Sequence, residues 1–159
     1  MADRERQIYQ RALRLLARRP RSTAELSWRL ARLGTPEVVR AVLQRLEREG
    51  LLDDLRFARL WVMARRARRG FGTDRLRREL WARGVNREVV EEALQLVQGE
   101  DEAVLAEQLA RARLRAYRGL EAKVAARRLS AYLMRRGFPS STIASVLRRM
   151  GLLDPPSGG

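Results

Sequence analysis

Apolar residues recur along this chain every three or four positions, the spacing that places them on one face of an α-helix. The segment from Val38 to Leu46 is typical, with apolar residues at positions 38, 39, 42, 43 and 46. No segment alternates apolar and polar residues as a half-buried β-strand would. The pattern therefore predicts an all-α fold.

The same helical layout occurs three times, in residues 22–46, 73–97 and 125–150. Each copy has an amphipathic helix, a glycine (Gly34, Gly84 or Gly137) and a second amphipathic helix, and a longer helix precedes each pair. We therefore predict three tandem three-helix repeats at 1–52, 53–99 and 100–153, followed by a disordered tail at 154–159. Small repeats bury little apolar surface alone, so they should stack into an elongated array, curved or straight.

Capping signals mark the expected helix ends. Ser22 and Glu25 have the spacing of a capping box, and Thr35 precedes a proline at a first helical position. Gly50 can end its helix in the left-handed conformation. The other predicted N-caps are Asp53–Asp54, Thr73, Asn86, and Ser140 or Ser141.

Positive charge dominates the composition, with 34 basic and 19 acidic side chains and a net charge of +15. The charge is uneven: residues 55–84 carry +8 and residues 111–150 carry +10, whereas residues 85–110 carry −6. Lys123 is the only lysine, so 33 of the basic residues are arginines, which suit bidentate contacts with phosphate or carboxylate. Such a field attracts nucleic acid, an anionic membrane or an acidic protein surface.

Two arginine-rich segments are the candidate binding surface. A single arginine near a helix C-terminus can simply complement the helix dipole. Several close together repel one another, and an anionic partner would relieve that repulsion. The candidate contact residues are Arg65, Arg66, Arg68, Arg69, Arg75, Arg77, Arg78, Arg135 and Arg136. The nearby aromatic residues Trp28, Trp81 and Phe71 are expected to pack between repeats, with stacking on bases as the alternative.

The residues for catalysis are scarce. The chain has no His and no Cys, which removes His bases, thiolate nucleophiles and nearly all zinc sites. We interpret the Asp53–Asp54 pair as a helix cap and not as a metal site. No stretch approaches the roughly 20 apolar residues of a membrane span. We expect a cytoplasmic protein with no enzymatic activity, metal or cofactor.

A DNA-binding transcription regulator of the helix–turn–helix type is the alternative from a different class. Residues 22–53 have the helix, turn and helix of a winged domain. Two short strands should follow as the wing, but the sequence after Asp54 has a helical pattern. The outward residues of the presumed recognition helix are mixed in charge, and the matching helix of the second repeat is acidic. A nonspecific nucleic-acid-binding protein also remains open.

Four stretches in order along the chain resemble the RecX family of bacterial regulators of the RecA recombinase. They are Arg11–Leu26, Leu46–Ala58, Gly72–Val85 and Tyr132–Phe138, and Leu76 departs from the isoleucine expected there. The resemblance implies a tandem three-helix-repeat protein of DNA repair, homologous recombination and the SOS response. It would bind RecA and its filament on DNA as a monomer and restrain ATP hydrolysis and strand exchange, with free DNA bound weakly and nonspecifically at most. It does not assign individual arginines.

Overall fold

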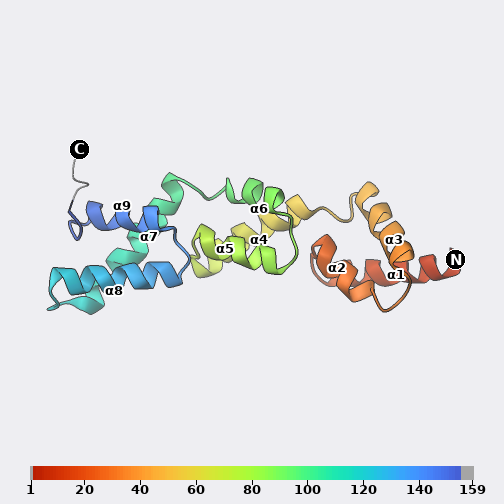
Figure 1. Cartoon of the computed structure of the whole chain (residues 1–159), viewed down its shortest axis with the longest axis horizontal. Helices are drawn as coiled ribbons and strands as arrows, with labels where there is room; N and C mark the ends of the chain where they lie inside the picture. The colour runs from red at the N-terminus through yellow and green to blue at the C-terminus, as the bar shows by residue number, and fades with distance from the viewer. Residues whose placement is uncertain (1, 155–159) are drawn as a thin grey trace. The chain divides into compact units, whose positions relative to one another are not determined.

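The computed structural model describes residues 2–154, and over these residues the chain forms α-helices, one short 3₁₀ helix and no β-strand (Figure 1). The elements are α1 (Ala2–Arg18), α2 (Thr23–Leu30), α3 (Pro36–Arg48), α4 (Asp54–Arg69), α5 (Thr73–Ala82), α6 (Arg87–Leu94), α7 (Glu100–Leu114), η1 (Arg115–Tyr117), α8 (Ala122–Arg135) and α9 (Ser140–Arg149). The predicted all-α class and three tandem three-helix repeats are confirmed. Apart from Asp154, the predicted disordered tail lies outside the described residues.

The chain divides into two compact units. The first unit consists of residues 1–61 and 79–93, and the second of residues 62–78 and 94–159. Each unit therefore contains one complete three-helix repeat and part of the middle repeat, because the division passes through α4 and α5. The repeat boundaries at 52 and 99 stay a prediction.

In the first unit, α1, α2 and α3 pack against one another around an apolar core (Figure 1). Its fully buried side chains come from the predicted apolar faces. They include Ile8, Ala12, Leu26, Leu30, Val42 and Leu46. Burial of each large aliphatic side chain stabilises the fold by about 1.5–3 kcal/mol relative to exposure.

In the second unit, α7, α8 and α9 form the corresponding three-helix core (Figure 1). α7 supplies small residues, Ala106 and Ala110, to this core, so that the larger side chains of α8 and α9 can pack closely against it. These larger side chains are Leu129, Leu133, Phe138, Ile143, Val146 and Leu147.

Most of the predicted helix caps are confirmed. Ser22 Oγ accepts a hydrogen bond from the Glu25 backbone N–H at 3.1 Å, and Thr35 Oγ1 accepts one from Val38 at 3.4 Å. Asp53 Oδ1 accepts from Arg56 N–H at 3.0 Å, and Asn86 Oδ1 accepts from Glu88 N–H at 2.8 Å. Gly50 has a φ of 72°, as its predicted role at a helix end requires.

Two predicted caps are wrong. Thr73 is the first residue of α5, and its hydroxyl donates to Glu102 because tertiary packing brings that carboxylate against the start of the helix. At α9 the N-cap position is taken by Pro139, whose extended backbone places Ser140 inside the first turn. Ser140 and Ser141 are therefore helical residues, and no side chain caps α9.

A first joint, formed by Ser22, Thr23, Asp54 and the Arg83–Gly84 turn, connects repeats one and two within the first unit. Asp54 Oδ1 accepts from the Thr23 backbone N–H at 2.7 Å and from the Thr23 hydroxyl at 3.0 Å. The Ser22 hydroxyl donates to the Arg83 carbonyl at 2.6 Å. Gly84, with a φ of 74°, lies so close to α2 that a Cβ there would be 2.3 Å from the Ala24 Cβ.

A second joint connects repeats two and three in the same way within the second unit. It consists of Gly72, Thr73, Glu102 and the Arg136–Gly137 turn. Glu102 accepts from the Thr73 backbone N–H at 2.7 Å and from its hydroxyl at 3.1 Å. The Gly72 backbone N–H donates to the Arg136 carbonyl at 2.9 Å. The repetition shows a rule of assembly: the first helix of one repeat supplies a carboxylate that caps the second helix of the repeat before it.

Candidate anion-binding surface

The nine candidate arginines all belong to the second unit, which is the more basic of the two. This unit contains eighteen basic and seven acidic side chains, a net charge of +11. The first unit contains sixteen and twelve, a net charge of +4, and the two together account for the +15 of the whole chain. The field that would attract a polyanion is therefore stronger around the second unit, which contains the candidate residues.

Arg66 differs from the exposed Arg68 and Arg69 of the α4 cluster because its side chain turns inward. It is half-buried, and its Nη2 donates to the Val97 carbonyl at 3.0 Å. Burial lowers the pKa of the Arg66 guanidinium, and the carboxylates of Glu102 and Asp101 partly oppose that effect. The structure therefore gives Arg66 a role in holding the second unit together.

Glu102 is the buried acidic partner of this region, with 3% of its surface exposed. Burial raises the pKa of its carboxyl group, whereas the hydrogen bonds from Thr73 and the charge of Arg66 lower it. The net direction is upward because the loss of hydration outweighs these favourable contacts. Keeping the Glu102 carboxylate charged at the second joint therefore lowers the stability of the fold.

This cost gives a pH-dependent prediction. The folded-state pKa of Glu102 lies above the unfolded value of 4.5, so protonation of its carboxyl group stabilises the fold. This contribution to the unfolding free energy is complete below pH 4.5 and is lost as pH rises through the folded-state pKa. The unfolding free energy of the wild type, minus that of Glu102→Gln, should therefore fall as pH rises. Urea unfolding from about pH 4 to about pH 7 measures this difference. A difference that is constant with pH would contradict it.

Three candidate arginines gather around the ring of Phe71. The guanidinium carbons of Arg75, Arg65 and Arg136 lie 3.7, 5.0 and 5.2 Å from the ring centroid. Arg136 Nη2 also donates to the Arg69 carbonyl at the end of α4. The negative face of an aromatic ring attracts cations, which offsets part of the repulsion among them. Phe71 is itself buried, so the packing role holds for it and stacking on bases does not.

Four other candidates present their side chains to solvent. We call Arg68, Arg69, Arg78 and Arg135 the exposed arginine set; none of them forms an ion pair with the residues described. Arg77, in contrast, is half-buried and pairs with Asp74 at 2.8 Å. The exposed arginine set is therefore the part of the predicted site that is best placed to meet a partner.

The two exposed tryptophans lie in the first unit. Trp28 is 60% exposed and rests beside Gly84, and Trp81 is 40% exposed with the Arg87 guanidinium 5.0 Å from its ring centroid. Trp28 packs at the first joint while leaving most of its ring in solvent. Packing between repeats thus accounts for its inner edge only.

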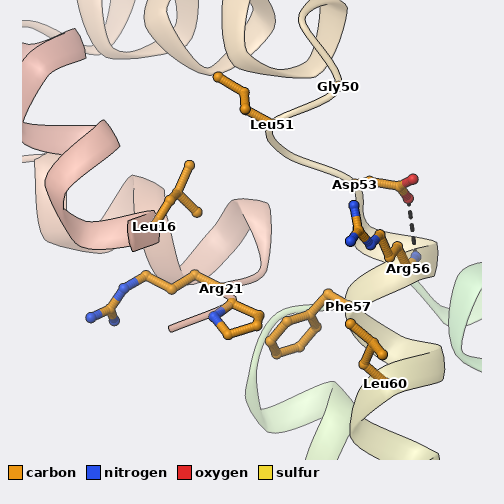
Figure 2. Close-up of a pocket in the computed structure, with 9 residues that line it drawn as sticks. Leu16, Arg21, Gly50, Leu51, Asp53, Arg56, Phe57 and Leu60 are labelled. Atoms are coloured by element: carbon orange, nitrogen blue, oxygen red, sulfur yellow. Dashed lines mark hydrogen bonds between the residues drawn. The ribbon is translucent and has the colours of Figure 1, made fainter. Parts of the chain in front are cut away.

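Figure 2 shows a pocket in the first unit. Its lining residues are Leu16, Pro20, Arg21, Gly50, Leu51, Asp53, Arg56, Phe57 and Leu60. Two of its charged side chains are engaged with the backbone: Asp53 caps α4, and Arg21 Nε donates to the Leu15 carbonyl at 3.4 Å. The Arg21 guanidinium points away from Asp53 and Arg56 (Figure 2), so these lining residues do not form an acid–base pair.

Between residues 2 and 154, no three His, Cys, Asp or Glu side chains gather as they would around a metal ion. In the same range, no helix is both long enough and apolar enough to cross a membrane.

The fold and the surface define a class: an all-helical tandem-repeat protein with an arginine-rich second unit. Comparison with known proteins identifies its family. Models of the first, second and third three-helix domains of RecX match residues 9–46, 53–94 and 100–147. The chain belongs to the RecX family.

Similar proteins agree with this assignment. The regulatory protein RecX of Thermobifida fusca is 40% identical over 146 residues, which cover 89% of this chain and 79% of that protein. The regulatory protein RecX of Mycobacterium ulcerans is 45% identical over 145 residues, covering 89% and 83%. The crystal structure of RecX from Lactobacillus salivarius shares the fold, with a TM-score of 0.90 at 19% identity over 96% of this chain and all of that one. The two regulatory proteins support a regulatory role, and the crystal structure supports the fold.

Proposed function

We propose that this chain is a negative modulator of the RecA recombinase. It binds RecA and the RecA filament on DNA, and it restrains ATP hydrolysis and strand exchange. In this role the chain carries out no catalysis and needs no metal or cofactor, and we expect it to be monomeric and cytoplasmic. The observation that carries the proposal is the match of all three RecX domain models, in order, along one chain.

The charge of the second unit supports this role. A filament of protein on DNA offers both phosphate groups and acidic side chains, and guanidinium groups bind either in a bidentate manner. The exposed arginine set presents four such groups without ion-pair partners among the described residues. We propose these four as the main contacts, with Arg65, Arg75, Arg77 and Arg136 shaping the surface around them.

The transcription-regulator alternative receives less support. A winged domain needs strands after its second helix, but α4 begins at Asp54 in that place. In the middle repeat the helix that would enter the major groove is α6, and it exposes Glu88, Glu91 and Glu92. Carboxylates on that face would be repelled by the phosphates on either side of the groove.

The test is RecA-catalysed ATP hydrolysis on single-stranded DNA, with this chain added at increasing ratios. We expect inhibition at well below one copy per RecA, since a regulator of a filament acts on many subunits at once. Inhibition that appears only when the protein is abundant enough to coat the DNA would contradict the proposal and favour a nonspecific nucleic-acid-binding protein.

A pair of variants tests the surface. Replacing Arg68, Arg69, Arg78 and Arg135 with Gln should raise the concentration for half-inhibition by at least roughly tenfold, which corresponds to about 1.4 kcal/mol of binding free energy. The matched control replaces Arg29, Arg40, Arg48 and Arg56 of the first unit, which are also exposed and without ion pairs among the described residues. It removes the same charge and should cost less than about threefold. Equal losses would mean that net charge, and not this surface, is responsible.

A further inference from the structure

A second arginine row lies on α1, outside the surface proposed above. Arg4, Arg11, Arg14 and Arg18 are all exposed, and their spacing of seven, three and four residues places them on one side of the helix. The row extends over about 21 Å, because each helical residue rises about 1.5 Å. We call these four residues the α1 arginine row.

These charges lack the partners that their neighbours have. Arg6, on the same helix, lies 4.0 Å from Asp3, and Arg19 pairs with Glu25 at 3.3 Å. Within the described part of the chain, no member of the α1 arginine row forms an ion pair. Four like charges along one helix face repel one another, and a chain of negative charges would convert that repulsion into attraction.

The row also borders a groove. Arg4, Arg11 and Arg14 line it together with Gln7, and Ile8 and Leu33 supply its apolar portion. Ile8 is buried and Leu33 half-buried, so the groups that reach solvent there are mainly guanidinium and amide donors. The groove thus offers hydrogen-bond donors and positive charge along one wall.

The surface lacks the features of a protein-binding site. Protein interfaces depend on a few aromatic or large apolar anchors surrounded by polar residues. No large hydrophobic side chain of α1 is exposed among its described residues. Contacts to a nucleic-acid backbone need only positive charges and donors, and they supply most of the nonspecific affinity. The chemistry of the row therefore favours phosphate over an acidic protein surface.

We propose that the α1 arginine row is a binding site for the phosphodiester backbone of a nucleic acid. Arg4, Arg11 and Arg14 hold phosphates along the groove, and Arg18 continues the line. The site belongs to the first unit and is separate in sequence from the exposed arginine set. We expect no selectivity for base sequence, because the proposed contacts of these arginines are all with backbone phosphates.

The test measures binding of the full chain to a fluorescein-labelled oligothymidylate by anisotropy, at several salt concentrations and with no recombinase present. Replacing the four arginines of the row with Gln should weaken binding at least roughly tenfold more than the control variant at Arg29, Arg40, Arg48 and Arg56. The slope of log affinity against log salt should become shallower by about 3, since each phosphate contact on a single strand contributes about 0.7. Equal losses in the two variants would overturn the proposal.

Two further measurements keep the result clear. The double variant Arg11→Gln with Arg14→Gln leaves the ends of the helix intact. Its slope of log affinity against log salt should become shallower by roughly half as much as in the variant with all four replacements. This keeps the test possible if that variant unfolds. Polyglutamate of matched charge serves as an acidic-protein probe. If the row variant loses affinity for polyglutamate by the same factor as for oligothymidylate, an acidic protein surface is the partner and the phosphate proposal fails.

Discussion

Replacing Gly137 with alanine should destabilise the second unit by about 3 kcal/mol. Gly137 has a φ of 90°, where an L side chain is strained by roughly 1–2 kcal/mol. A Cβ there would also lie 2.2 Å from the Arg75 Cβ and 2.6 Å from the Arg75 backbone nitrogen. α5 would have to move away from the turn, and overpacking of this kind costs about 1–3 kcal/mol. The hydrogen bond from Asp74 N–H to the Gly137 carbonyl, now 2.9 Å, would be strained as well.

Gly151 provides the matched control in the same unit. Its φ is 71°, and the structure places nothing within 4 Å of a Cβ built on it. Gly151→Ala should therefore carry the backbone cost alone. Urea unfolding followed by circular dichroism compares the two variants. If Gly137→Ala costs no more than Gly151→Ala, the close approach at the second joint does not contribute to stability.

The helices themselves were predictable because their signals are local. The apolar positions of α3 repeat with the helical period, and Thr35 and Pro36 mark its start within three residues of the groups that they cap. Such patterns depend on backbone geometry and on which face is buried, and both can be read over a short window. The same holds for Gly50, whose left-handed backbone ends α3.

The joints were not predictable in this way. Thr73 follows the local pattern of an N-cap, but its hydroxyl donates to a carboxylate 29 residues later in the chain. Asp54 resembles part of a cap, yet it binds Thr23, 31 residues earlier. Local capping rules cannot predict an acceptor that tertiary packing brings in from a distant part of the chain. Only the spacing of the repeats indicated that Asp54 and Glu102 lie in the first turns of equivalent helices.

The candidate site shows a similar division. The arginine-rich segments were predictable from the sequence, but the prediction assigned all arginines of the α4 cluster to one binding surface. Arg66 lies four residues after the buried Val62 and eight after the buried Ala58, so helical spacing places it on the inner face. That signal was present in the sequence. The cluster of Arg65, Arg75 and Arg136 around Phe71 was not, because it joins three separate segments.

Removing the Glu102 side chain should destabilise the second unit by about 3 kcal/mol. In Glu102→Ala the Thr73 backbone N–H and hydroxyl lose their acceptor in a buried position, which costs about 1–3 kcal/mol for an unsatisfied group. The half-buried Arg66 also loses a carboxylate that favours its charged form. Breaking one side of a buried charged arrangement is costlier than its net contribution suggests, because the remaining charge stays desolvated.

Glu100 is the control on the same helix. It lies in the same first turn of α7, so both variants remove one favourable interaction with the helix dipole. Its side chain is 72% exposed and lies 3.3 Å from Arg149, and an exposed pair of this kind contributes at most about 1 kcal/mol. Urea unfolding should therefore separate Glu102→Ala from Glu100→Ala by roughly 2 kcal/mol. Equal effects would mean that the helix dipole, and not the capping of Thr73, explains why an acidic residue stands at position 102.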